Sequence, residues 1–138
     1  MSESSRHILL VSNIVKWIHH TQATEDLCIL VDEPSRSAAN KPPNVGGYQP
    51  DVFVKALGRP LTIIGEAKTI QDLETPRSEL QLIAYLSHLK IIENPFLVIS
   101  TTWTVQRTAK SLLCQLRNAG NAAHVPLVFL TELAPVTC

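Results

Sequence analysis

The chain has few cysteines and no long apolar run, and both shortages narrow the kinds of protein it can be. Its three cysteines, Cys28, Cys114 and Cys138, are too few and too scattered for a disulfide framework or a zinc site. No apolar stretch approaches the roughly 20 residues that span a bilayer. The polar residues 1–6 also lack a signal-peptide pattern. We therefore expect reduced thiols, no membrane partner and a cytoplasmic protein.

Net charge is also lacking, because twelve basic residues balance twelve acidic ones. A neutral chain is not expected to coat nucleic acid through bulk electrostatics. The distribution is uneven, however, since residues 94–131 contain Arg107, Lys110 and Arg117 but no acid. Helical spacing makes Arg107 and Lys110 neighbours, and either is a candidate phosphate contact. For Arg117, a solvated helix face is an equally good interpretation.

Two neighbouring β-branched runs carry the most informative charges. Residues 50–57 and 60–68 each have the composition of a strand, and turn residues at 58–60 predict an antiparallel hairpin. The second run is apolar until its end, where the alternation of side chains along a strand places Glu66 and Lys68 on one face. The charged pair is therefore expected at the end of a buried strand. The alternative is a simple ion pair on a solvated strand.

The predicted hairpin brings Asp51, at the start of its first strand, next to Glu66 at the end of its second. Two carboxylates without an accompanying histidine or cysteine favour Mg²⁺ or Mn²⁺ over zinc. A bound cation lowers the pKa of its water, and the ammonium of Lys68 can orient that nucleophile. These residue types predict metal-dependent hydrolysis of a phosphodiester.

Pro50-Asp51 and Glu66-Ala67-Lys68 resemble the signature of the PD-(D/E)xK nuclease superfamily, which has the restriction-endonuclease-like fold. The resemblance implies that Asp51 and Glu66 are metal ligands, with the Ala67 carbonyl as a further ligand. It also implies that Lys68 is the catalytic lysine.

The resemblance extends to Gln81 and Tyr85, which match the Gln-x-x-x-Tyr pair of recombination exonuclease domains. A spacing of four places both side chains on one helical face. The resemblance implies that they support metal, water or phosphate. One departure is that residues 7–20 contain no acid, whereas many superfamily members carry a metal-binding glutamate in the first helix. A substitute would have to come from Glu25, Asp26, Asp32 or Glu33.

The other elements follow from apolar periodicity and turn residues. They are a helix over 7–20, strands over 27–31, 96–100 and 126–130, a helix that begins at Thr75 and Pro76, and a helix over 104–118. In the helix after Thr75, a wide apolar side is indicated by Leu80, Ile83 and Leu86 with Leu82 and Leu89. Its polar side includes Gln81 and Tyr85. We expect one α/β domain over residues 1–138, a restriction-endonuclease-like mixed sheet flanked by helices in the order α-β-β-β-α-β-α-β.

Residues 34–47 are rich in Pro, Ser, Asn and Gly and lie just before Asp51. They predict a mobile loop beside the site, in which Arg36 and Lys41, with Tyr48 at its tip, can touch substrate. An ordinary connection is the alternative.

The expected activity is that of a Mg²⁺-dependent deoxyribonuclease that hydrolyses DNA phosphodiester bonds by metal-activated water. Small members of the superfamily often pair, so the resemblance also implies a homodimer. A fold does not guarantee its chemistry, so one alternative is a weak or inactive module that binds nucleic acid or a protein partner. Another is a toxin-like or restriction-related effector whose partner protein supplies specificity.

Overall fold

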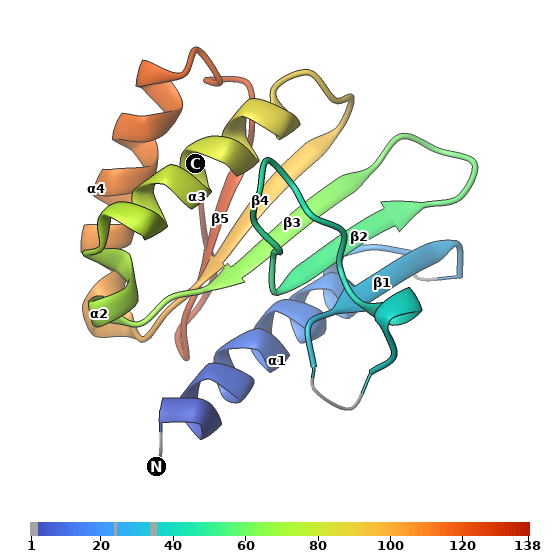
Figure 1. Cartoon of the computed structure of the whole chain (residues 1–138), viewed down its shortest axis with the longest axis horizontal. Helices are drawn as coiled ribbons and strands as arrows, with labels where there is room; N and C mark the ends of the chain where they lie inside the picture. The colour runs from blue at the N-terminus through green and yellow to red at the C-terminus, as the bar shows by residue number, and fades with distance from the viewer. Residues whose placement is uncertain (1–2, 24, 34–35) are drawn as a thin grey trace.

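One mixed sheet of six strands organises the chain (Figure 1). The computed structural model describes residues 3–23, 25–33 and 36–138. The strands lie side by side in sequence order: β1 (Leu27–Val31), β2 (Val52–Ala56), β3 (Thr62–Ala67), β4 (Pro95–Ser100), β5 (Leu127–Leu130) and β6 (Val136–Thr137). The first three strands pair antiparallel, β3, β4 and β5 pair parallel, and β6 returns antiparallel.

Helices cover both faces of this sheet, so the chain has the expected mixed α/β class. α1 (Glu3–Thr21) packs on one face, and α3 (Pro76–Leu89) and α4 (Trp103–Ala119) pack on the other (Figure 1). The described order also contains short elements that were not predicted, namely η1 (Ala38–Asn40), α2 (Ile70–Leu73) and β6. None of the helices in the described part of the chain has the length and apolarity to span a bilayer.

The predicted hairpin is confirmed by the pairing of β2 with β3. Val52 lies opposite Gly65, and Lys55 lies opposite Thr62. The turn between the strands contains Gly58 at φ +81°, a left-handed conformation that glycine adopts without steric cost. The start of β2 and the end of β3 therefore lie at the same edge of the sheet.

The predicted start of α3 is confirmed. On its predicted apolar side Leu82, Leu86 and Leu89 are buried, as expected, but Leu80 and Ile83 are not. The Thr75 side chain caps the helix by accepting a hydrogen bond from the Ser78 N–H at 3.1 Å. Leu80 and Ile83 are 57% and 39% exposed, whereas Tyr85 is fully buried. The sheet takes the face that carries Tyr85, because that face also presents several leucines.

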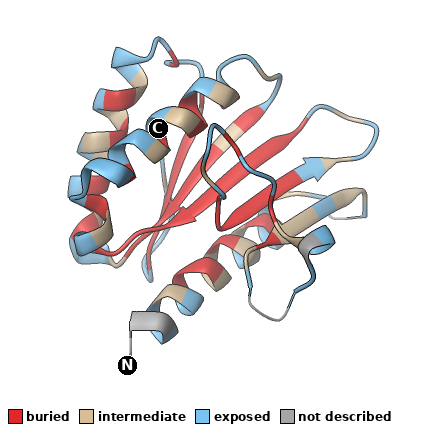
Figure 2. Ribbon diagram, viewed as in Figure 1, coloured by how far each residue is buried: buried red, intermediate tan, exposed pale blue. Residues whose placement is uncertain are grey.

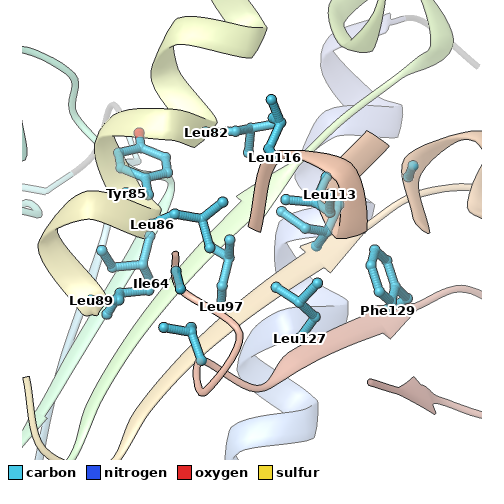
Figure 3. Packing of buried hydrophobic residues seen from close by; sticks show 14 of the residues in the cluster. Ile64, Leu82, Tyr85, Leu86, Leu89, Leu97, Leu113, Leu116, Leu127 and Phe129 are labelled. Atoms are coloured by element: carbon cyan, nitrogen blue, oxygen red, sulfur yellow. The ribbon is translucent and has the colours of Figure 1, made fainter. Parts of the chain in front are cut away.

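Most residues of the central strands are buried (Figure 2), and a hydrophobic cluster lies on each face of the sheet. On the α1 face, Ile14 and Ile18 pack with strand residues such as Ile63. The opposite face is the larger cluster (Figure 3), and its fully or almost fully buried members include Ile64, Leu82, Tyr85, Leu86, Leu89, Leu97, Leu113, Leu127 and Phe129. Each large apolar side chain contributes about 1.5–3 kcal/mol on burial. This packing fixes α1 and α3 on opposite faces of the sheet, so both helices flank the start of β2 and the end of β3.

The segment predicted as a mobile loop, residues 34–47, is only partly described, because residues 34 and 35 lie outside the described residues. Its later part packs against α3, since Val45 is 4% exposed and belongs to the larger core cluster. A Cβ added to Gly46 would lie 2.8 Å from the Ala84 Cβ, so the backbone approaches α3 closely there. This later part of the segment therefore covers the sheet next to α3 (Figure 1).

Candidate metal centre

The two carboxylates predicted to meet do meet, at the edge of the sheet formed by the start of β2 and the end of β3. Asp51 immediately precedes β2, and its Oδ2 accepts a hydrogen bond from the Ala67 N–H at 2.8 Å. Asp51 and Glu66 are 8% and 4% exposed. The antiparallel register is the cause, because the pairing of Val52 with Gly65 places the preceding residue beside the end of β3.

Glu66 is held by two side chains from α3. The Tyr85 hydroxyl donates to Glu66 Oε1 at 2.9 Å, and the Gln81 amide donates to the same oxygen at 3.1 Å. Gln81 also donates to the Tyr85 hydroxyl at 3.1 Å. Residues four apart on a helix share a face, so α3 presents both groups to the strand end together. The predicted Gln81 and Tyr85 pair is therefore next to the predicted ligand Glu66.

Lys68 joins the same network through Gln81. Its ammonium donates to Gln81 Oε1, so one amide links the cation of Lys68 to the carboxyl group of Glu66. Lys68 is only 6% exposed. The strand end is therefore not the solvated face that a simple surface ion pair of Glu66 and Lys68 would require.

Burial and proximity displace the pKa values of both acids. Burial raises the pKa of Glu66 well above its usual value, and the neighbouring Asp51 carboxylate raises it further. Burial alone would also raise the pKa of Asp51, but hydrogen bonds from His7, from the Glu66 carboxyl group and from the Ala67 N–H outweigh it and lower the pKa. The pair therefore holds Asp51 in its ionised form more strongly than Glu66.

This donor set fits a hard divalent cation. A cation between Asp51 and Glu66 would offset the repulsion between the two carboxylates that raises the pKa of Glu66. Among the described residues, no group of three or more His, Cys, Asp or Glu side chains could hold a metal. An ion here would depend on the two carboxylates, a backbone carbonyl such as that of Ala67, and oxygens from solvent or substrate, as Mg²⁺ sites commonly do.

His7 of α1 is a site residue that the sequence analysis missed. Its Nε2 lies 3.3 Å from Asp51 Oδ1, and this hydrogen bond raises the pKa of His7, although partial burial opposes the rise. The first helix thus contributes a histidine beside Asp51, whereas many members of the superfamily have a metal-binding glutamate in that helix. No spacing signal marks His7, because its partner is 44 residues away in the sequence, counting from 7 to 51.

The acids considered as substitutes for a first-helix glutamate have other partners. Asp26 pairs with Arg59 at 2.8 Å, Asp32 lies 3.9 Å from the Lys41 ammonium, and Glu33 pairs with Arg36 at 3.1 Å. No interaction of the fourth, Glu25, with Asp51 or Glu66 is seen in the described part of the chain. None of the four therefore completes the site.

The residues predicted to contact nucleic acid are dispersed. Arg36 and Lys41 belong to the acid pairs just described, and the Arg77 guanidinium lies over the Tyr48 ring, 5.2 Å from its centroid. Arg107 is exposed on α4 and Lys110 half-buried on the same helix. Within the described residues, none of these five contacts Asp51, Glu66 or Lys68. Their proposed role would need a substrate that extends over several faces.

Comparison with known proteins identifies no relative, because no protein-family model, no curated protein and no solved structure matches the chain. The site therefore has to be interpreted from its own chemistry.

Proposed function

We propose that the chain is a nuclease of restriction-endonuclease-like fold that hydrolyses DNA phosphodiester bonds with Mg²⁺ or Mn²⁺. The observation that carries this proposal is the buried pair of Asp51 and Glu66, which is linked through Gln81 to Lys68. Buried acids held in a repulsive pair are costly to the fold, and such groups gather at functional sites.

The carboxylates of Asp51 and Glu66 and the Ala67 carbonyl would hold the ion. It would supply Lewis-acid activation of water and offset negative charge that develops on the phosphate. No histidine or cysteine ligand is required for this chemistry, which agrees with the choice of Mg²⁺ or Mn²⁺ over zinc.

The other site residues position these groups. Tyr85 and Gln81 hold Glu66 in one orientation, and His7 and the Ala67 N–H hold Asp51. Lys68 provides a buried ammonium that can stabilise an anionic phosphate oxygen, and its low exposure strengthens that interaction because little water screens it. Catalysis would draw mainly on this fixed arrangement of charge.

DNA as the substrate and a homodimer are parts of the proposal supported by the resemblance alone. A partner protein that supplies specificity belongs to the alternative of a toxin-like or restriction-related effector. The rival function is an inactive module that retains the fold and binds nucleic acid or a protein. Low exposure of the site favours the rival, because Asp51, Glu66 and Lys68 are each at most 8% exposed and a phosphate needs some side-chain movement to reach them.

Cleavage assays decide between the two. Plasmid, linear and branched DNA are incubated with Mg²⁺, Mn²⁺ or EDTA and wild-type protein, Glu66→Gln or Lys68→Met. Glu79→Gln, on the exposed face of α3, is the matched control for Glu66→Gln. We expect metal-dependent cleavage by the wild type and the control only. Cleavage that persists in Glu66→Gln and Lys68→Met would contradict the proposal, and binding without cleavage by the wild type would support the rival.

A further inference from the structure

A cavity of about 1070 Å³ lies between α1, β1 and the residues that follow β3. Its apolar wall is formed by Ile8, Val11 and Val15 of α1 and by Ile29 and Val31 of β1. Val11 and Val31 are buried in the core, whereas Ile8 is 66% exposed and Val15 and Ile29 are half-buried. Aliphatic surface left open beside a buried polar site is a common feature of ligand pockets.

The cavity adjoins the candidate metal centre through His7 and Thr69. His7 lines it and also contacts Asp51 at 3.3 Å. Thr69, which also lines it, directly follows Lys68 in the chain. A group in the cavity would therefore be a near neighbour of a phosphate bound at Asp51 and Glu66.

The charges around the cavity select the kind of group that fits. Its lining includes the acids Asp32, Glu33 and Asp72, together with His7, His19 and Arg36, and Arg36 pairs with Glu33 at 3.1 Å. Among the described residues that line it, the acids outnumber the one guanidinium, so the lining favours an uncharged group over a phosphate. The lining also carries hydrogen-bonding groups, including Ser12, while the wall is aliphatic. A nucleobase combines apolar faces with a polar edge of donors and acceptors, and it is uncharged. The cavity suits a base better than it suits the backbone.

We propose that this cavity binds an unstacked base next to the cleaved phosphate, so that the preferred substrate is a single strand or a frayed end. This inference rests on the proposed nuclease function and names its substrate class. Bases inside a duplex are stacked and paired, and extracting one costs a few kcal/mol, whereas a single strand offers its bases freely. Duplex DNA would therefore be bound more weakly than the same strand alone.

Binding measurements without turnover test the cavity independently of catalysis. Lys68→Met protein, which keeps both carboxylates, is titrated with a single strand that carries a fluorescent adenine analogue. Val15→Trp, which fills the cavity from α1, is expected to weaken binding about tenfold. Leu9→Trp is the matched control, because Leu9 is 47% exposed on α1 and does not line the cavity. It should stay within about twofold of the parent protein.

A second pair of variants tests the cavity independently, in case Val15→Trp does not fold. Ile29 lines the cavity, and its neighbour Cys28 is exposed on the opposite face of β1. Ile29→Glu and Cys28→Glu add the same charge to the same strand, and only Ile29→Glu should weaken binding of the analogue strand. Equal binding by the two glutamate variants, or an unchanged Val15→Trp, would overturn the inference.

Cleavage of abasic strands tests whether a base bound in the cavity promotes cleavage of the neighbouring phosphodiester. An abasic residue moved along a single strand should slow wild-type cleavage about tenfold at one position beside the scissile phosphate, and Val15→Trp should lose that dependence. If no position matters, or if duplex is cleaved as fast as single strand, the cavity inference fails while the nuclease proposal stands. If nothing is cleaved, the nuclease proposal fails, and the analogue titration still decides the cavity.

Discussion

His7 Nε2 lies 3.3 Å from Asp51 Oδ1, so the amino-terminal part of α1 is tied to the edge of the sheet where Asp51 and Glu66 meet. The contact joins the first helix to a residue just before β2. It supplies Asp51 with a basic partner, and this hydrogen bond lowers the pKa of Asp51.

Loss of the contact between His7 and Asp51 should lower the free energy of unfolding in a limited pH range. The pKa of His7 is raised from 6.5, so its contribution is present in full below that value and is lost as the pH rises through the folded pKa. The pKa of Asp51 is lowered from 3.8, so its contribution is present above that value and is lost as the pH falls through the folded pKa. We expect His7→Ala to destabilise the protein most between these limits.

The effect of His7→Ala should stay below about 1 kcal/mol, because the His7 side chain is partly exposed and solvent screens the pair. Urea unfolding of His7→Ala and of the exposed control His19→Ala at several pH values measures it. An effect that is equal at all pH values would show that packing, not the pair with Asp51, is responsible.

Mg²⁺ should stabilise the protein more as the pH rises. The folded pKa of Glu66 lies well above its ordinary 4.5, so the metal-free protein gains full stability from this group below 4.5 and loses it as the pH rises through the folded pKa. A cation that binds only the ionised pair reverses that loss.

Thermal melts with and without Mg²⁺ across this range measure the metal effect. Glu66→Gln removes the titrating group and keeps its shape, so it should abolish both the fall in stability of the metal-free protein and the gain with Mg²⁺. A Mg²⁺ effect that is the same in wild type and Glu66→Gln would place the ion elsewhere.

Tyr85→Phe should destabilise the protein by about 1–3 kcal/mol, because it removes a buried hydrogen bond to Glu66 and leaves that carboxyl group less well satisfied. Tyr48→Phe is the natural control, since Tyr48 is half-buried and its ring lies under Arg77. Denaturant unfolding compares the two variants. Equal losses in the two variants would show that the buried hydroxyl of Tyr85 stabilises the protein no more than the hydroxyl of Tyr48 does.

Gly65→Ala should destabilise the protein by about 1–3 kcal/mol through overpacking between α1 and β3. A Cβ on Gly65 would lie 2.8 Å from Ile14 Cγ2 and 3.2 Å from Val52 Cβ. Combining it with Ile14→Ala should give a double variant more stable than the sum of the single losses predicts, because Ile14→Ala makes room for the new methyl group. Strict additivity would show that the two sites do not touch.

Several features of the site could be predicted because they depend on neighbours in the sequence. The turn residues at 58–60 between two β-branched runs indicate a hairpin, and the hairpin alone places Asp51 beside Glu66. The spacing of four between Gln81 and Tyr85 determines that they share a face of α3. Thr75 and Pro76 mark the start of that helix through local hydrogen bonding and the fixed φ of proline.

Other features could not be predicted, because they depend on how the helices pack on the sheet. The periodicity of α3 was recognised, but Leu80 and Ile83 were assigned to the core, whereas Tyr85 is buried there instead. A helix that carries apolar residues on more than one side has no unique buried face until its partner surface is in place.

The α/β class, the hairpin and the meeting of Asp51 with Glu66 follow from the amino-acid sequence, because turn geometry and strand alternation are local. The contact of His7 with Asp51, the link from Lys68 through Gln81 to Glu66 and the cavity between α1 and β1 emerge only from the folded chain. These contacts join elements far apart in the chain, and their distances are set by how the helices pack on the sheet.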